Sequence, residues 1–189
     1  MRMTDEKTAG AVAGGEPVAK GGWPHDIYSV LKASDVRLVA YVPDAGHAEL
    51  IRMVQADREM TPALLTTEEE GVALLAGAWM GGMRGALLMQ SSGVGNCINM
   101  LSLQVATRFP LLMVITMRGD WAELNAWQNP MGQATEQALK LMGVMIWRAD
   151  TPEDVAPLLQ GAAKMAFEGD AACAVLLGQR LIGEKQWVK

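Results

Sequence analysis

Three adjacent glutamates stand immediately before a run of small and apolar residues that carries no charge. They are Glu68, Glu69 and Glu70, and the run covers residues 71–79. Acids at the start of a helix are ordinarily solvated and offset the helix dipole. A helix built of small residues can, however, pack closely against another backbone and desolvate a carboxyl at its buried end. Because desolvation raises the pKa of a carboxyl, such a glutamate is suited to exchanging a proton near neutral pH.

A second candidate is the glycine-containing segment 90–96, Gln-Ser-Ser-Gly-Val-Gly-Asn. It follows an apolar run and precedes a helical pattern, so its backbone amides could receive a phosphate or a polar heterocycle. It is not a dinucleotide fingerprint, because no small residue follows Gly95 at the required position, and the chain has no P-loop motif. The alternative is a tight strand-to-helix turn with Asn96 capping the next helix. The spacing alone leaves both interpretations open.

The elements that must position these residues belong to a domain of ordinary size. The 189 residues are 50% hydrophobic and 20% charged, which excludes a disordered chain. The net charge of -5, without a lysine or arginine cluster, argues against nucleic-acid or anionic-membrane binding. Two distant cysteines and two histidines do not form a zinc motif. The absence of a disulfide framework favours a reducing compartment, and we expect a cytoplasmic protein.

Neither the N-terminal segment nor the long uncharged segment 85–107 predicts a targeting signal or a membrane anchor. We expect residues 1–23 to form a flexible leader, since acidic and basic residues interrupt them early. Residues 85–107 are uncharged and long enough to span a bilayer, but Gln90, Asn96 and Asn99 would place polar groups in hydrocarbon. A buried strand followed by a helix explains that segment better.

Residues 24–189 alternate between short apolar runs and stretches with helical spacing. Strands are predicted at 36–41, 63–67, 86–90, 111–116, 144–147 and 173–177, and helices at 26–33, 47–55, 69–83, 96–107, 135–142 and 152–167. This pattern predicts one doubly wound α/β domain with about six mostly parallel strands and helices on both faces. Ligands of such sheets bind at the carboxyl ends of the strands. The loops 43–47, 90–96 and 117–131 are therefore the places to look for function.

Several short motifs, each weak alone, occur in an order and spacing specific to one family. They are Val42-Pro43, Thr67-Glu68-Glu69-Glu70-Gly71, Ala76-Gly77-Ala78-Trp79, the segment 89–96, Phe109-Pro110-Leu111-Leu112, Arg118-Gly119-Asp120 and Pro130-Met131-Gly132-Gln133. On these motifs, residues 26–177 resemble the pyrimidine-binding (PYR) domain of thiamine-diphosphate enzymes. They are most similar to the α subunit of sulfopyruvate decarboxylase and to the matching part of phosphonopyruvate decarboxylase.

The resemblance implies decarboxylation of a 2-oxo acid with thiamine diphosphate as the electron sink. It also implies that one glutamate of this domain hydrogen-bonds the aminopyrimidine ring and activates the cofactor. Alignment on Gly71 and Trp79 assigns this role to Glu69, whereas alignment on Gly77 assigns it to Glu68. We expect Glu69, with Glu68 as the alternative.

The same resemblance implies that the segment after the third predicted strand lines the cofactor. The residues concerned are Gln90, Ser91, Gly93, Gly95 and Asn96.

On the substrate side the resemblance implies Asp44, His47, Arg118 and Gln133. The guanidinium of Arg118 matches a sulfonate, phosphonate or carboxylate, although a lone loop arginine is more often solvated. His47 could move a proton during product release if its pKa lies near neutrality. Segment 43–47 and Met117 depart from the family pattern. The expected substrate is therefore only as specific as a 3-sulfo- or 3-phosphonopyruvate-like 2-oxo acid.

Members of this family bind the diphosphate and Mg²⁺ through a second domain that carries a Gly-Asp-Gly motif. Here Gly119-Asp120-Trp121 and Gly169-Asp170-Ala171 both lack the third glycine. The resemblance therefore implies no metal ligand in this chain and a separate β-type subunit that completes the site and supplies the Mg²⁺ ligands. The alternative is a non-catalytic PYR-like subunit that binds a partner or a metabolite and performs no turnover.

Overall fold

A single sheet of six parallel strands forms the centre of the computed structural model, which describes residues 22–183. The strand order is β2-β1-β3-β4-β6-β5, and every neighbouring pair is parallel. The strands are β1 (Val36–Tyr41), β2 (Thr61–Leu64), β3 (Arg84–Gln90), β4 (Leu111–Thr116), β5 (Met145–Ala149) and β6 (Ala172–Leu177). The predicted α/β class is confirmed.

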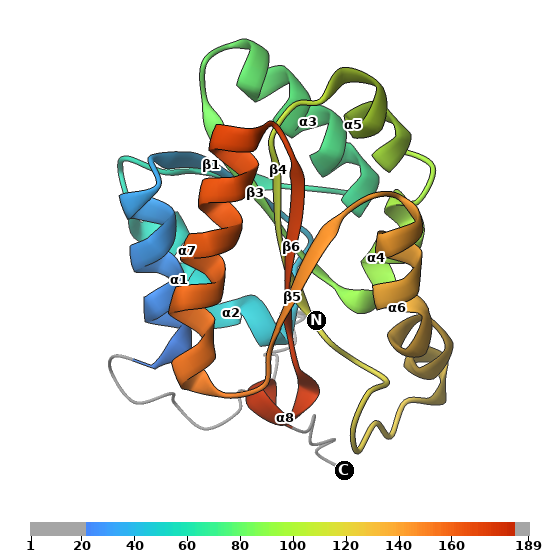
Figure 1. Ribbon diagram of the computed structural model, residues 1–189. Helices are drawn as coiled ribbons and strands as arrows, with labels where there is room; N and C mark the ends of the chain where they lie inside the picture. Colours follow the sequence, from blue (N-terminus) through green and yellow to red (C-terminus); the bar gives the residue numbers. More distant parts are fainter. Residues whose placement is uncertain (1–21, 184–189) are drawn as a thin grey trace, which may run out of the picture.

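Helices cover both faces of this sheet, as Figure 1 shows. One face carries α1 (Trp23–Ala33), α2 (Ala48–Ala56) and α7 (Pro152–Gly169). The other face carries α3 (Glu68–Met80), α4 (Ser91–Cys97), α5 (Leu101–Thr107) and α6 (Asn129–Leu141). The short elements η1 (Ala45–His47), η2 (Ala126–Gln128) and α8 (Gln179–Ile182) lie in connections. Among the residues that the structure describes, no helix is both long and apolar enough to cross a bilayer.

The continuous apolar runs of the strands supply two cores at once, because successive side chains of a strand point to opposite faces. In β3, Ala86 and Leu88 pack beneath α1, α2 and α7, whereas Leu87 and Met89 pack beneath the helices of the other face. Both β4 and β6 are buried at every position. Sheet position, more than local propensity, therefore explains why these segments contain almost no polar residue.

The largest difference from the predicted elements is at residues 90–107. The sequence predicts a loop over 90–96 and one helix over 96–107, but the chain enters α4 directly at Ser91. Asn96 therefore lies inside α4, so the alternative interpretation, in which it caps the next helix, is wrong. The glycines of this segment allow another element to approach a helix closely, as described below, and do not form a turn.

Smaller differences concern where helices and strands begin. Helix α6 starts at Asn129 instead of 135 because Pro130 in its first turn favours initiation there. Strand β2 is an edge strand that ends at Leu64 and does not continue through 67. Helix α1 begins at Trp23, with Pro24 in its first turn. Residues 1–21 of the predicted leader lie outside the described residues.

The topology leaves one place where the chain departs in opposite directions from two neighbouring strands. From β1 it passes through α2 to β2 on one side, and from β3 it passes through α4 and α5 to β4 on the other. Open α/β sheets form a ligand crevice outside the carboxyl ends of such a pair. Asp44 follows β1, and Gln90 is the last residue of β3. The expected ligand site is therefore centred on these two residues.

The packing of α3 on the sheet can be tested with Leu87→Ala. Leu87 is fully buried in β3, and its side chain occupies the place where a Cβ on Gly71 of α3 would stand. We expect the substitution to lower the free energy of unfolding by about 2–5 kcal/mol, measured by urea denaturation. The control Leu64→Ala removes a side chain that is 68% exposed and should change stability by less than about 0.5 kcal/mol. Equal losses in the two variants would contradict this account of the core.

Candidate functional site

The first group of the site is a buried carboxylate that rests on a glycine of α4. Glu68, the first residue of α3, is only 8% exposed. Its Oε2 accepts a hydrogen bond of 2.8 Å from Nδ2 of Asn96. A Cβ on Gly93 would overlap the carboxyl group of Glu68, so the two helices approach this closely only because residue 93 has no side chain.

The neighbouring glutamates have different surroundings. Glu69 and Glu70 are both exposed, and Oε2 of Glu70 accepts a hydrogen bond from the backbone N–H of Thr66. Of the three acids, only Glu68 is desolvated and in contact with the predicted cofactor residues Gly93 and Asn96. The placement thus favours Glu68, the alternative, over the expected Glu69.

Cys97 lies near this carboxylate, and its thiol is expected to be unreactive. Burial, together with the charges of Glu68 and Glu69, raises the pKa of the Cys97 thiol to about 12. The sulfur therefore stays protonated at neutral pH and behaves as a small apolar group, because the thiolate is the nucleophilic form.

The second group joins the ends of β1, β3 and β4 through Asp44. Its Oδ1 accepts a hydrogen bond of 3.0 Å from Nε2 of Gln90, and its Oδ2 accepts one of 2.7 Å from the hydroxyl of Thr116. The hydroxyl of Ser92 donates to Oε1 of Gln90 at 2.8 Å. Because a carboxylate only accepts, Asp44 fixes which end of the Gln90 amide faces which neighbour. Sequence analysis missed Thr116, although it is the polar last residue of an apolar strand.

His47 lies beneath this group and has no exposed surface. Its Nε2 contacts the backbone carbonyls of Met89 and Val114 at 3.3 and 3.2 Å. Since carbonyls only accept, Nε2 must carry a proton. Burial lowers the pKa of His47 below its ordinary 6.5, against the opposing effect of Asp44. His47 is thus placed in the core between strand ends, away from solvent, and not as a side chain presented to a substrate.

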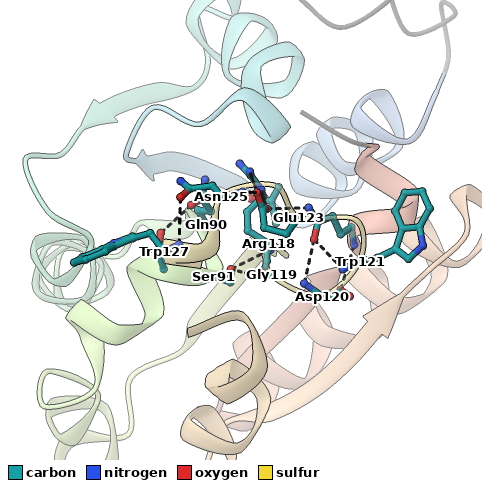
Figure 2. Close-up of polar contacts among 12 residues, drawn as sticks. Gln90, Ser91, Arg118, Gly119, Asp120, Trp121, Glu123, Asn125 and Trp127 are labelled. Carbon is teal, nitrogen blue, oxygen red and sulfur yellow. Dashed lines mark hydrogen bonds and ion pairs between the residues drawn. The ribbon is translucent and has the colours of Figure 1, made fainter. Parts of the chain in front are cut away.

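The third group, Arg118 and Glu123, lies in the connection that follows β4 and fixes its conformation. Arg118 is 8% exposed and makes a bidentate ion pair with Glu123, with Nε–Oε2 and Nη2–Oε1 distances of 2.5 and 2.7 Å (Figure 2). The Arg118 guanidinium is the main reason that the pKa of Glu123 falls to about 2. The backbone N–H of Arg118 donates to the hydroxyl of Ser91 at 3.0 Å, which ties this connection to the start of α4.

Gln179, which sequence analysis missed, anchors the same connection from the end of β6. It is 1% exposed, and its Oε1 accepts the backbone N–H groups of Asp120 and Trp121 at 3.1 and 3.0 Å. Its Nε2 donates to Glu123 at 2.9 Å. The signal in the sequence is weak but present, because Gln179 is the first polar residue after the buried run of β6.

Gln133 does not join the crevice between β1 and β3. Its Nε2 donates to the carbonyl of Gly119 at 2.7 Å, and it lines a polar depression of about 260 Å³ with Asp120 and Arg148. Arg148 in turn pairs with Asp120 and Asp150. Within residues 22–183, no group of three or more His, Cys, Asp or Glu side chains is arranged to hold a metal ion.

Comparisons with known proteins find relatives that are all named as decarboxylases or decarboxylase subunits. It is 34% identical over 152 residues to the sulfopyruvate decarboxylase subunit alpha of Methanococcus maripaludis, covering 80% of this chain and 91% of that one. It is 30% identical to the sulfopyruvate decarboxylase of Methanosarcina acetivorans, covering 82% of this chain but 40% of the relative. It is 36% identical to the phosphonopyruvate decarboxylase of Streptomyces hygroscopicus, covering 68% and 33%. No protein-family model matches the chain.

Among solved structures, a 2-oxoglutarate:ferredoxin oxidoreductase from Magnetococcus marinus matches with a TM-score of 0.67 and 12% identity. The match covers 85% of this chain and 29% of that one, and it concerns the fold alone.

The fold defines a doubly wound α/β domain whose expected ligand site is at the carboxyl ends of β1 and β3, with a buried glutamate at the start of α3. The identity and coverage of its relatives make the assignment specific. The chain belongs to the family of sulfopyruvate decarboxylase alpha subunits.

The buried neutral His47 predicts a loss of stability at acid pH. The unfolded chain binds a proton at His47 as the pH falls below 6.5, whereas the folded chain does not until lower pH, so the free energy of unfolding falls in this range. His47→Gln, whose amide can donate to the same carbonyls, should reduce this slope by up to about 1.4 kcal/mol per pH unit. Urea denaturation between about pH 7.5 and pH 5.5 (about one unit on either side of the ordinary value) measures it. Parallel curves for the two proteins would contradict the assignment.

Proposed function

We propose that this chain is the cofactor-activating subunit of a thiamine-diphosphate-dependent decarboxylase that acts on a 3-sulfo- or 3-phosphonopyruvate-like 2-oxo acid. The observation that carries the proposal is the carboxylate of Glu68, desolvated at the start of α3 and held against α4. Membership of a family whose relatives are named decarboxylases supports the reaction class.

The residues at this position fit the pyrimidine ring of the cofactor. Oε2 of Glu68 accepts a hydrogen bond from Asn96, while Oε1, which lies against Gly93, would be the oxygen that hydrogen-bonds a ring nitrogen. Asn96 would orient the carboxylate, and Gly93 provides the space in which it lies. When bound, thiamine diphosphate supplies the electron sink for decarboxylation. The part of Glu68 is to hold a proton at that ring nitrogen in a site that excludes water.

Residues at the strand ends would contact the substrate or the same cofactor. Gln90 and Ser92 border the crevice with a hydrogen-bond polarity that Asp44 fixes. Ser91 and Gly95 would add backbone contacts from α4. We assign Asp44 a positioning role, because both of its oxygens are already engaged.

Arg118 is the proposed contact for the anionic end of the substrate. Its ion pair with Glu123 uses Nε and Nη2 and leaves Nη1 for a second anion. Because Glu123 already neutralises the guanidinium, recognition would rely on directed N–H groups more than on net charge.

A separate subunit would complete the site and bind the diphosphate and Mg²⁺. In support, the chain matches 91% of a relative named as an alpha subunit but 40% of a relative named as the decarboxylase without a subunit label. Leu124 and Trp127, in the connection that carries Arg118, are 75% and 84% exposed, and the Trp127 side chain extends away from the ion pair (Figure 2). Exposed apolar side chains beside a crevice suit a partner surface. We propose a cytoplasmic hetero-oligomer.

The assignment of Glu68 can be tested against Glu69 by the same substitution at adjacent positions. In the complex with the partner subunit, thiamine diphosphate and Mg²⁺, Glu68→Gln should lower kcat for decarboxylation of sulfopyruvate or phosphonopyruvate by about 100-fold or more, because it removes the proton-holding group. Glu69→Gln, at an exposed position, is the matched control and should stay within about three-fold of wild type. Loss of activity in Glu69→Gln, with Glu68→Gln active, would reverse the assignment.

Gly93→Ala tests the same carboxylate through its surroundings. The added Cβ would push the Glu68 side chain aside, so thiamine-diphosphate binding to the complex, measured by titration calorimetry, should weaken by about ten-fold or more. The control Gly161→Ala adds a methyl group to α7 where no atom lies within 4 Å. It should leave cofactor binding unchanged and raise stability slightly. Unchanged cofactor affinity in Gly93→Ala would count against the proposed site.

A further inference from the structure

The buried side-chain amide of Gln179 helps to fix the connection between β4 and α6. The side chain of Gln179 is inaccessible to solvent, yet it makes three hydrogen bonds to residues about 60 positions earlier in the chain. Two come from the backbone amides of Asp120 and Trp121 to its Oε1. The third goes from its Nε2 to Oε2 of Glu123. Each polar atom of this amide is therefore engaged by the connection that carries Arg118.

The polarity of these partners permits one residue type. Backbone N–H groups can only donate, and the carboxylate of Glu123, whose pKa is lowered to about 2, can only accept at neutral pH. A glutamine presents an acceptor and a donor to the two sides. A glutamate at position 179 would face a like charge, and a leucine would leave two buried amide hydrogens and a buried carboxylate without this partner.

The hydrogen bonds that begin at Gln179 continue through Glu123 and Arg118 to Ser91, the first residue of α4. Glu123 also accepts the backbone N–H of Asn125 at 2.9 Å and forms the bidentate pair with Arg118. The backbone of Arg118 exchanges two hydrogen bonds with the hydroxyl of Ser91, at 3.0 and 3.3 Å. Figure 2 shows Arg118, Glu123, Asp120 and Ser91 gathered along this connection. Gln179 is thus linked to the start of α4 without contacting the crevice itself.

We propose that Gln179 is a positioning residue for substrate recognition. It fixes Glu123 and the backbone at 120–121, and through them it holds the Arg118 guanidinium in the orientation that receives the anionic end of the 2-oxo acid. This inference rests on the proposed function, in which Arg118 contacts that end. The cofactor site at Glu68 does not depend on Gln179, so the two can be separated by experiment.

Steady-state kinetics of the complete complex test the consequence for the substrate. Gln179→Leu and Gln179→Glu should raise KM for sulfopyruvate or phosphonopyruvate by about ten-fold or more, because the guanidinium is no longer held in place before binding. The kcat and the affinity for thiamine diphosphate should stay within about three-fold of wild type. Gln160→Leu and Gln160→Glu, at an exposed position of α7, are the matched controls and should leave KM unchanged.

Hydrogen exchange supplies a readout that does not require activity. The amides of Asp120 and Trp121 donate to Gln179, so they should exchange at least about ten-fold faster in Gln179→Leu than in wild type. If the wild-type complex decarboxylates no 2-oxo acid, the proposed function fails. Separately, unchanged exchange at these two amides would show that Gln179 does not fix the backbone at 120–121, which would overturn the inference. If the wild-type complex is active but KM is unchanged in both Gln179 variants, the inference is overturned while the proposed function stands.

Discussion

The carboxylate of Glu68 occupies the space that any side chain at position 93 would need, and much of the surrounding structure serves this contact. Helix α4 must begin directly at the end of β3, so that Gly93 lies in its first turn. Helix α3 must begin at Glu68 and not one residue later, because a shift of one residue would turn a different acid toward α4. Burial of a carboxylate costs free energy that a single amide hydrogen bond only partly offsets. The contact itself therefore does not account for the stability of the fold.

Two kinds of polar network fix the edge of the sheet around this contact. Asp44 joins the ends of three strands and sets the orientation of the Gln90 amide, while Gln179 and Glu123 hold the connection after β4. In both, an acceptor-only carboxylate leaves its neighbours one arrangement of donors and acceptors. Fully satisfied networks of this kind specify one conformation at a position where apolar packing has ended. The crevice is therefore lined by loops that are held in place although they carry little of the core.

The sequence predicts the sheet well because its signal is repeated. Six apolar runs separated by helical spacing lead to one topology class, and β4 has the predicted bounds. The site is less predictable because single residues decide it. Gly93 and Gly95 resemble a turn, but both lie in α4, where the lack of a side chain lets Glu68 approach the first and Met131 the second. His47 has the chemistry of a catalytic residue, but a neighbouring pair of carbonyls places it in the core. Gln179 carries no motif, and its role follows only from its partners.

The ambiguity between Glu68 and Glu69 has a geometric origin. Successive residues of a helix differ by about 100° in direction, so a one-residue uncertainty in an alignment exchanges a buried side chain for an exposed one. Motif spacing could not decide between Gly77 and Trp79 as the reference, because both lie in α3 within two residues of each other. Burial distinguishes the two acids: Glu68, which lies opposite a residue without a side chain, is buried, whereas Glu69 is exposed. Gly93 on the opposing helix therefore indicates which of the adjacent acids is buried, whereas Gly77 and Trp79 on α3 itself do not.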